Sequence, residues 1–435
     1  MARLRLGLSL LLSAFCFLPS AFAQDARFFI ERIEVRNVHR VSPQLIIREA
    51  LLREGSEYTE ADLAAAAARL NRLPFVLSAD FSLEKGSDRG RHVLVINVME
   101  TKPFFFLVNL SPTLWDDSRR TVDYDVDFGT ESKDAALGFR WFVGGRGIVH
   151  VGVSSRRDRQ TFTQDYTTAA IGYTQYDLFG TRAFATVNLR LPIDMGGKLS
   201  PELVVGMPVS ANQTLTLDYE DTNARDKNVR AYDGNIFRKM DSQRLITLAW
   251  TYNTTNQPFV PTRGTIVRVA PLMSLSDRAS YTFSGPFVNN TIPPSVGYAQ
   301  HRKGYGVDLS ASRYWELSDL HSVSAGVLAG WAHVEEHTSP AIDVFVPTVV
   351  EWRPAYEIVR AGYSRNLWKG DPKRGDSRIE LDGRFVVSQR HVDRGDVVFG
   401  TTPDHEDTFQ LAAGWIRRSS YGTLRLGLGY SWGHY

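Results

Sequence analysis

Hydrophobic and polar side chains alternate along most of the chain. The clearest case lies between Ser242 and Val269, where Ile246, Leu248, Trp250 and Tyr252 alternate with Thr247, Ala249, Thr251 and Asn253. Successive side chains of a strand point to opposite faces of a sheet, so this run predicts a strand with one apolar and one wetter face. Prolines and Gly264 interrupt the pattern before it resumes at Ile266, which predicts an antiparallel hairpin.

Shorter runs of the same kind recur at 121–128, 135–141, 149–153, 169–173, 185–191, 215–219, 305–311, 323–331, 409–415 and 424–432. In the first of them, Asp123, Asp125 and Asp127 share one face. Three acids on one strand face are costly in the dry core of a β-sandwich unless each is paired, but they cost little if they face water inside a wide barrel. We therefore predict that the hairpins close into a transmembrane antiparallel β-barrel, with its apolar side chains toward lipid.

The connections between these runs come in two sizes. Short ones span 129–134, 144–147, 210–212 and 419–422, and long polar ones span 222–241, 278–302 and 335–354. Short turns at one end and long loops at the other are typical of outer-membrane barrels. About 15 or 16 candidate strands follow Lys102, and we expect 16, because bacterial single-chain barrels normally have an even number. Segments 104–112 and 356–368 leave the count open between about 14 and 16.

The first 23 residues have the features of a secretory signal peptide. Two arginines precede an apolar stretch over 6–18, and Ala21-Phe22-Ala23 is an A-x-A cleavage site, so the mature chain is expected to start at Gln24. The alternative is an uncleaved N-terminal membrane anchor. The single cysteine, Cys16, lies inside this segment, so no disulfide is predicted for the mature protein.

Composition and compartment support an exported protein without a nucleic-acid partner. The 435 residues carry a formal net charge of +2, which implies no general attraction to nucleic acid. After residue 23, no apolar run approaches the roughly 18 residues that a membrane helix needs. An exported chain without cysteine in its mature part fits a bacterial periplasm or outer membrane. We expect the outer membrane of a Gram-negative bacterium, with the N-terminal domain in the periplasm.

Residues 28–100 predict a small α+β domain in the order β-α-α-β-β. Its strands are expected at 29–38, 75–83 and 92–98. The first helix is expected to end at Gly55, and Thr59 with Asp62 has the pattern of a capping box that opens the second. Two helices on a three-stranded sheet leave open sheet edges, and an open edge can accept an extended peptide.

This element order resembles a POTRA domain, the periplasmic module of BamA/TamA-type outer-membrane proteins. The matching positions are Ile33-Glu34-Val35, Leu52, Gly55, Leu63, Leu70, Leu73-Pro74-Phe75 and Val98-Met99-Glu100. The usual Gly-Asn after the first strand is Arg36-Asn37 here, and another small α+β domain of the same order is the alternative. In the barrel region, Pro261-Thr262-Arg263-Gly264 is similar to the family's Pro-Thr-x-Gly turn. The last strand, with Tyr430, Trp432 and Tyr435, resembles its C-terminal assembly signal.

The family's hallmark is a Val-Arg-Gly-Phe/Tyr motif in an extracellular loop that folds back into the lumen. The nearest match is Val359-Arg360-Ala361-Gly362-Tyr363, with one extra residue, and Asp382 resembles the acidic partner of the arginine. A guanidinium held by a carboxylate inside the channel would pin such a loop as a plug. The alternative is that 356–368 is an ordinary strand, with Arg360 facing water.

The predicted fold is thus mainly β. It has a signal peptide over 1–23, a POTRA-like periplasmic domain over 28–101, a linker or first strand over 102–120 and a barrel over 121–435. No catalytic, nucleotide-binding or metal-binding motif has a supporting context, because Asp404-His405-Glu406-Asp407 reads as a solvated loop. We expect no cofactor and no enzyme activity.

Three functions remain open on this basis. The resemblance implies a monomeric barrel that inserts or translocates polypeptides, with membrane lipid and unfolded client chains as its partners. The client would bind the POTRA-like sheet edge, and a weakly paired seam between first and last barrel strands would template its strands. The alternatives are a passive pore or surface scaffold without this activity, and a barrel-borne hydrolase, for which the sequence offers no paired nucleophile and base.

Overall fold

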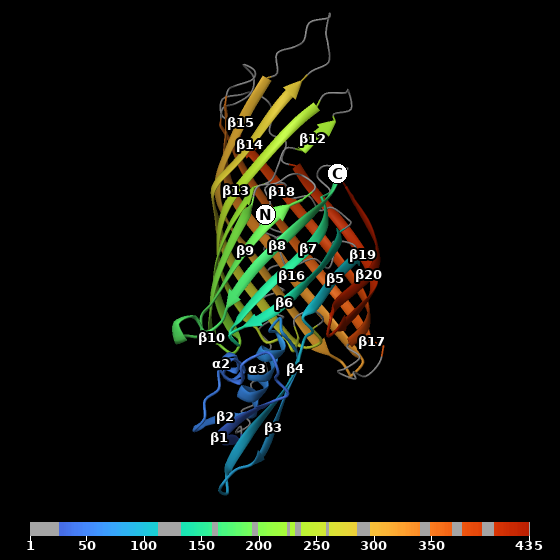
Figure 1. The fold of residues 1–435 in the computed structure, drawn as a ribbon. Coiled ribbons are helices and arrows are strands. Elements are labelled where there is room, and N and C mark those ends of the chain that lie inside the picture. The colour runs from blue at the N-terminus through green and yellow to red at the C-terminus, as the bar shows by residue number, and fades with distance from the viewer. Residues whose placement is uncertain are drawn as a thin grey trace, which may run out of the picture.

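The computed structural model has two parts, a small N-terminal domain and a large sheet rolled into a barrel (Figure 1). It describes residues 26–111, 132–158, 164–193, 199–223, 227–230, 236–257, 261–284, 296–339, 349–367, 376–393 and 404–434. The predicted cleavage site at Ala23 and Gln24, the 121–128 strand with its three aspartates, and Tyr435 lie outside these residues. None of the helices among the described residues is long and apolar enough to cross a membrane.

The small domain is a four-stranded sheet with two helices. Its elements are β1 (Arg27–Arg36), α2 (Pro43–Ala50), β2 (Ser56–Thr59), α3 (Glu60–Asn71), β3 (Val76–Lys85) and β4 (Arg91–Glu100). The strand order is β2-β1-β4-β3, in which β1 and β4 are parallel. We expected three strands, and β2 is the addition, because a four-residue segment is too short to show a clear alternation.

The helix boundaries follow local hydrogen bonding. The predicted capping box is present, since the Thr59 hydroxyl accepts from the Asp62 N–H at 3.1 Å and an Asp62 oxygen accepts from the Thr59 N–H at 3.0 Å. The first helix does not end at Gly55 as expected. It ends at Leu51, which adopts a left-handed conformation with φ of 60°. Gly55 also has positive φ, but it lies in the turn that leads into β2.

The barrel strands follow in chain order. The first group is β5 (Phe104–Ser111), β6 (Ser132–Val143), β7 (Gly147–Asp158), β8 (Gln164–Gln175), β9 (Phe184–Pro192), β10 (Ser200–Ser210) and β11 (Gln213–Asn223), with the 3-10 turn η2 (Leu178–Gly180) between β8 and β9. The second group is β12 (Lys227–Arg230), β13 (Ile236–Asn253), β14 (Gly264–Ser284), β15 (Val296–Glu316), β16 (His321–Ser339), β17 (Val349–Asn366), β18 (Asp376–Asp393), β19 (Asp404–Ser419) and β20 (Gly422–His434).

Among the described residues, fifteen strands form the closed ring, whereas we expected sixteen. Each strand pairs with its neighbour in sequence, β11 pairs with β13, and β20 pairs with β5, while the short β12 adds only to β13. Neighbours run antiparallel, so an odd number of strands makes β5 and β20 parallel. The described part of the uncertain segment, Phe104–Ser111, forms β5, and the strand predicted at 121–128 lies outside the described residues.

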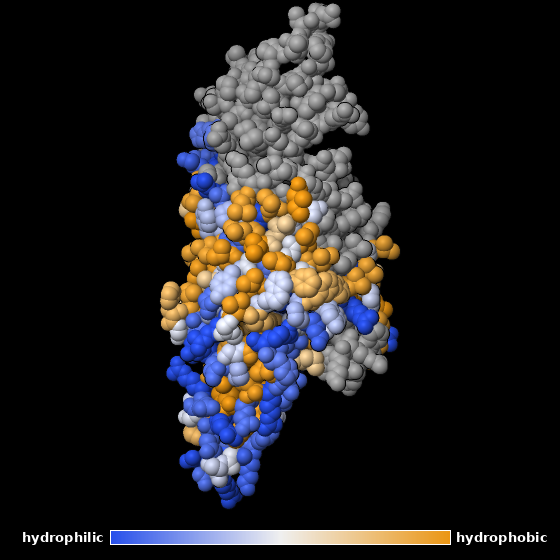
Figure 2. Space-filling model, viewed as in Figure 1, coloured by the Kyte–Doolittle hydropathy of each residue, from blue (hydrophilic) through white to orange (hydrophobic). Residues whose placement is uncertain are grey.

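The two faces of the barrel wall differ as the alternation predicted. On β13, Leu248 is 50% exposed whereas its neighbours Thr247 and Ala249 are 7% and 2% exposed. Large apolar side chains are exposed in the same way around the ring, as with Leu137, Phe139 and Trp141 on β6 and Leu203, Val205 and Met207 on β10. Figure 2 shows the resulting apolar band across the barrel, beside a mostly hydrophilic small domain. Apolar side chains outside and polar ones inside are the pattern of a membrane-spanning barrel.

The wall is taller on one side than on the other. Strands β13 to β18 have 18–21 residues, whereas β6 to β11 have 9–12. About 9–11 residues suffice to cross a membrane. The longer strands therefore extend beyond the apolar band at the end away from the small domain (Figure 1).

Candidate functional site

The seam between β5 and β20 is the shortest closure in the ring. β20 pairs with β5 over five positions, from Gly422 opposite Phe106 to Leu426 opposite Leu110, but with β19 over thirteen. No described residue pairs with the outer edge of β20 over 427–434. An unpaired strand edge presents free N–H and C=O groups to any extended segment that reaches it.

The seam is held at the end next to the small domain. The Phe106 N–H donates to the Tyr421 carbonyl and the Lys102 N–H to the Ser420 carbonyl, both at 2.8 Å. Gly422 makes this close approach possible, because an added Cβ would lie 1.8 Å from the Phe106 carbonyl oxygen. Its φ of 151° also favours glycine. The seam is therefore clasped at its near end, and no described residue pairs across its far end.

The loop between α3 and β3 inserts into the barrel mouth beside this clasp. Phe75, which is fully buried, meets the rings of Phe142 and Tyr176 edge to face, at 5.6 and 5.5 Å between centroids. Ile148 and Tyr176 of the barrel thereby join the core of the small domain. The two parts share one continuous hydrophobic core.

Three arginines tie this loop to the barrel through backbone carbonyls. Arg72 donates to the carbonyls of Thr255 (3.0 Å) and Ala211 (2.9 Å), which lie in two different barrel turns. From the barrel, Arg140 donates to the Pro74 carbonyl and Arg418 to the Val76 carbonyl. Burial, with the charge of Arg69 adding to it, lowers the pKa of Arg72 to about 10, so Arg72 still carries its charge at neutral pH.

Glu100 fixes the start of β5. Its carboxylate accepts from the N–H groups of His39, Arg40 and Val41 and from the Arg40 guanidinium at 3.0 Å. Burial works against ionisation, but these donors outweigh it and lower the pKa of Glu100 below its usual value. Thr101, the next residue, donates its N–H to the Phe75 carbonyl.

The predicted lumen motif lies in strand β17 and not in a loop. Val359 is exposed on the outer face, while Arg360 points inward and donates to Ser312 (2.7 Å) and Tyr314 (3.4 Å). Gly362 pairs with Asp382 of β18, and the Asp382 charge acts on Arg360, so the expected acid does lie beside the arginine. Tyr363 faces outward and bonds His321 at 2.6 Å. Through Ser312 and Tyr314, Arg360 thus braces the wall between β17 and β15.

The turn at Pro261-Thr262-Arg263-Gly264 is braced by an asparagine side chain. Asn256 donates to the Thr262 hydroxyl at 2.8 Å and accepts from the Thr262 N–H at 3.1 Å. Gly264 has a φ of 105°, and an added Cβ would lie 2.4 Å from the Thr254 carbonyl oxygen. Arg263 is exposed. The turn residues are therefore explained by local geometry at the mouth of the barrel.

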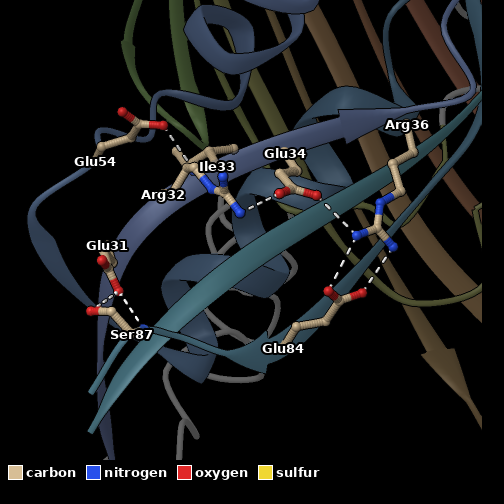
Figure 3. A network of polar contacts seen from close by, with 8 residues as sticks. All are labelled: Glu31, Arg32, Ile33, Glu34, Arg36, Glu54, Glu84 and Ser87. Carbon is tan, nitrogen blue, oxygen red and sulfur yellow. Dashed lines mark hydrogen bonds and ion pairs between the residues drawn. The ribbon is translucent and has the colours of Figure 1, made fainter. Parts of the chain in front are cut away.

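The small sheet has a charged open face and two short free edges. Arg36 bridges Glu34 (2.9 Å) and Glu84 (2.8 Å) on the face away from the helices (Figure 3). On the β3 edge, Asn71 bonds both backbone groups of Ala79, so the open part of that edge begins at Phe81. At the other edge, Glu54 caps the Ile33 N–H beyond the end of β2 (Figure 3).

Sequence reasoning missed the residues that join the two parts. Arg140 and Arg418 occupy ordinary strand positions, and no local pattern marks them as partners of a loop far away in the sequence. Tyr430 and Trp432 lie on β20 as predicted. Within the described residues, no group of three or more histidine, cysteine, aspartate or glutamate side chains is placed to hold a metal ion.

No protein-family profile matches the chain, and no curated protein matches it. Among solved structures, it is similar to BamA from Haemophilus ducreyi lacking POTRA domains 1–3, with 14% identity and a TM-score of 0.34 over 93% of this chain and 85% of that one. It is also similar to CdiB from Acinetobacter baumannii, with 10% identity and a TM-score of 0.35 over 94% and 74% of the two chains. CdiB from Escherichia coli is similar as well, with 9% identity and a TM-score of 0.34 over 96% of this chain and 93% of that one. Because these TM-scores are low, the fold class rests on the strand order and closure of this chain itself.

Proposed function

We propose that this chain is a BamA/TamA-type barrel of the Gram-negative outer membrane that assists the insertion or translocation of polypeptides. The observation that carries the proposal is the β5–β20 seam, in which the described residues pair at five positions and none of them pairs with the β5-facing edge of β20 over 427–434. A client strand that pairs with this edge satisfies its backbone before it meets lipid. Burial of its apolar side chains in the bilayer then supplies the free energy, so no nucleotide, metal or cofactor is needed.

The small domain, which faces the periplasm in this proposal, would deliver the client to the seam. On the β3 edge, Ala79 uses its backbone groups on Asn71, so the alternate residues Phe81, Leu83 and Lys85 present theirs on the same edge. An extended client segment can add to this edge as a further strand. Because the small domain and the barrel share a core, this edge holds a fixed position relative to the seam.

The direct test is to lock the seam with a disulfide. Cysteines replace Thr423 and Leu107, which are register partners across the seam, in a Cys16→Ser background. The matched control replaces Thr216 and Ala249, which are partners across the β11–β13 closure. The readout is insertion of an unfolded eight-stranded outer-membrane barrel into proteoliposomes. We expect the oxidised seam lock to abolish insertion, reduction to restore it, and the control lock to have no effect.

The opposite result would exclude a seam mechanism. If the oxidised seam lock inserts clients as fast as the control lock, the seam does not open during insertion. Deleting residues 24–100 is a second test, in which client assembly should fail while the barrel itself still reaches the membrane. Because this deletion also removes Phe75 from the barrel mouth, heat-modifiable migration on gels must first show a folded barrel.

A passive pore or surface scaffold is the second candidate function. The position of 359–363 in the wall favours it, because the motif then lies in a barrel strand and not in a loop folded into the lumen. This candidate predicts steady open conductance in planar bilayers together with no client insertion. No hydrolase activity is expected, and an esterase assay on the folded protein tests that expectation.

A further inference from the structure

The turn between β8 and β9 exposes an apolar residue at the rim of the barrel. Phe179 is 94% exposed, with φ of 52° and ψ of 32°, and Asp177 two residues earlier also has a left-handed backbone. Residues with a side chain rarely adopt this conformation, so two such residues in one turn need support from the surrounding structure. Figure 1 shows the turn projecting sideways from the barrel, next to α2 of the small domain.

The turn is held rigidly. The Leu178 N–H donates to the Ala183 carbonyl at 2.8 Å, and the Thr181 hydroxyl donates to the Leu178 carbonyl at 2.6 Å. Asp177 is 6% exposed and pairs with Arg146 of the neighbouring barrel turn at 2.8 Å. It also pairs with Arg48 of α2. The exposed ring of Phe179 is therefore presented by a braced turn that is tied to the small domain.

The surface beside the turn indicates what covers it. Trp141, Val149 and Tyr173 pair across β6, β7 and β8 in one row, and Trp141 and Tyr173 are 47% and 39% exposed on the outer face. Tryptophan and tyrosine on the outer face of a barrel mark the level of the membrane interface. The turn follows β8 directly, so Phe179 lies just beyond the end of the strand that carries Tyr173.

Other turns at the same end of the barrel repeat this feature. Leu317 (64%), Leu320 (38%), Leu367 (41%) and Tyr421 (47%) are also exposed. Phe179 differs from them in its exposure and in its link to the small domain through Asp177 and Arg48.

We propose that the β8–β9 turn is a lipid-interface anchor, in which Phe179 inserts at the headgroup–acyl boundary of the leaflet on the side of the small domain. Through Asp177 and Arg48 the anchor fixes the height of the small domain against the bilayer. An aromatic residue at this depth is favoured because its ring leaves water without reaching the hydrocarbon centre. The inference rests on the membrane placement in the proposed function and adds a binding surface for phospholipid.

The test attaches an environment-sensitive fluorophore to single cysteines of the full chain, in a Cys16→Ser background, in vesicles of phosphatidylethanolamine and phosphatidylglycerol. The sites are Phe179→Cys, Met207→Cys on the outer wall and Leu83→Cys on the small domain; Met207 and Leu83 are 49% and 36% exposed. We expect the label at 179 to shift to the blue relative to the label at 83. A spin label near the headgroups should quench it more than one at mid-chain.

The outcomes distinguish failure of the Phe179 lipid anchor from failure of the proposed membrane barrel. If 207 is quenched by lipid and 179 behaves like 83, the anchor is wrong while the membrane barrel stands. If 207 is not quenched, the membrane placement itself fails. Blue-shifted emission at 179 in native membranes but not in vesicles would show a protein partner in place of lipid and would overturn the proposal. A second variant, Arg48→Ala, should leave the label at 179 in the bilayer but increase amide exchange in α2.

Discussion

The ring closes at two places that differ sharply, at β11–β13 and at β5–β20. The first closure is antiparallel and pairs eleven positions, from Gln213 opposite Tyr252 to Asn223 opposite Ser242. The second is parallel and pairs five positions, and no described residue pairs with the β5-facing edge of the far half of β20. The free energy of opening therefore differs along the ring, and the barrel should open at the β5–β20 seam first.

The odd strand number explains part of this difference. In a ring of alternating strands, one closure must be parallel if the count is odd, and parallel pairing is slightly less stable per residue. In the part of the chain that the structure describes, β5 offers eight residues to the thirteen of β20. What holds the seam lies at one end, where Gly422, Tyr421 and Lys102 meet next to the small domain.

The largest effect on the stability of the β5–β20 seam is expected from Gly422→Ala. The new methyl would overlap the Phe106 carbonyl, so β5 must move away and the short seam loses its clasp. At about 1 kcal/mol for each net hydrogen bond, loss of the seam amounts to several kcal/mol. Heat-modifiable migration on gels should show a clearly lower unfolding temperature, and disulfide formation between cysteines at 107 and 423 should fall.

Gly383→Ala is the matched control for that substitution. A Cβ at Gly383 would meet only the end of the Leu411 side chain at 3.2 Å, which can move. Its unfolding temperature and its cross-linking yield should stay close to those of the parent. If Gly422→Ala behaves like Gly383→Ala, the clasp does not hold the seam.

A smaller loss of stability is expected from breaking the ion pair beside the seam. Arg425 of β20 and Glu380 of β18 lie 3.4 Å apart, and both side chains are largely buried. Removing one partner of a buried pair costs about 3–5 kcal/mol, because the other charge is left behind. Arg425→Ala should therefore lower the unfolding temperature more than Arg425→Ala combined with Glu380→Gln. Equal losses in both variants would mean that the pair is not coupled.

The strands were predictable from sequence, whereas the difference between the two closures was not. Alternation such as that from Ile246 to Tyr252 is local, and it correctly placed β13 and its outward face. The seam depends instead on the number of strands in the ring from β5 to β20 and on a contact between Phe106 and Gly422, which are far apart in the sequence. The parity argument for sixteen strands failed because it is a tendency of the class, not a consequence of these residues.

The candidate site was predictable in a similar, partial way. The Arg360–Asp382 neighbourhood followed from a motif, but the motif could not tell a loop from a strand, because Val359 and Tyr363 also fit the outward positions of β17. The docking of Phe75 had no signal at all, since a phenylalanine after Leu-Pro reads as the core of its own domain. Contacts between distant segments need the folded structure.

A pH effect on the seam is expected through Glu100, which positions β5. The folded pKa of Glu100 lies below the usual 4.5, because N–H donors and Arg40 hold the ionised form. Its stabilisation is therefore fully present above pH 4.5 and is lost as the pH falls through the lower folded value. Spin labels attached at 107 and 423 at neutral pH should show a broader distance distribution in acid, while a pair at 216 and 249 across β11–β13 should stay unchanged. Glu100→Gln should show the acid behaviour already at pH 7.

The smallest effect on the two closures is expected from Arg360→Ala. Arg360 lies on β17, away from both closures, and its loss removes hydrogen bonds to Ser312 and Tyr314. We expect a loss of about 1–3 kcal/mol in stability. Cross-linking at both closures and planar-bilayer conductance should stay as in the parent, because Ser312 and Tyr314 lie on β15 of the wall. A rise in conductance in this variant would contradict the strand placement and restore the plug hypothesis. An altered cross-linking yield between 107 and 423 alone would show that the inner wall from β17 to β20 is coupled to the β5–β20 seam.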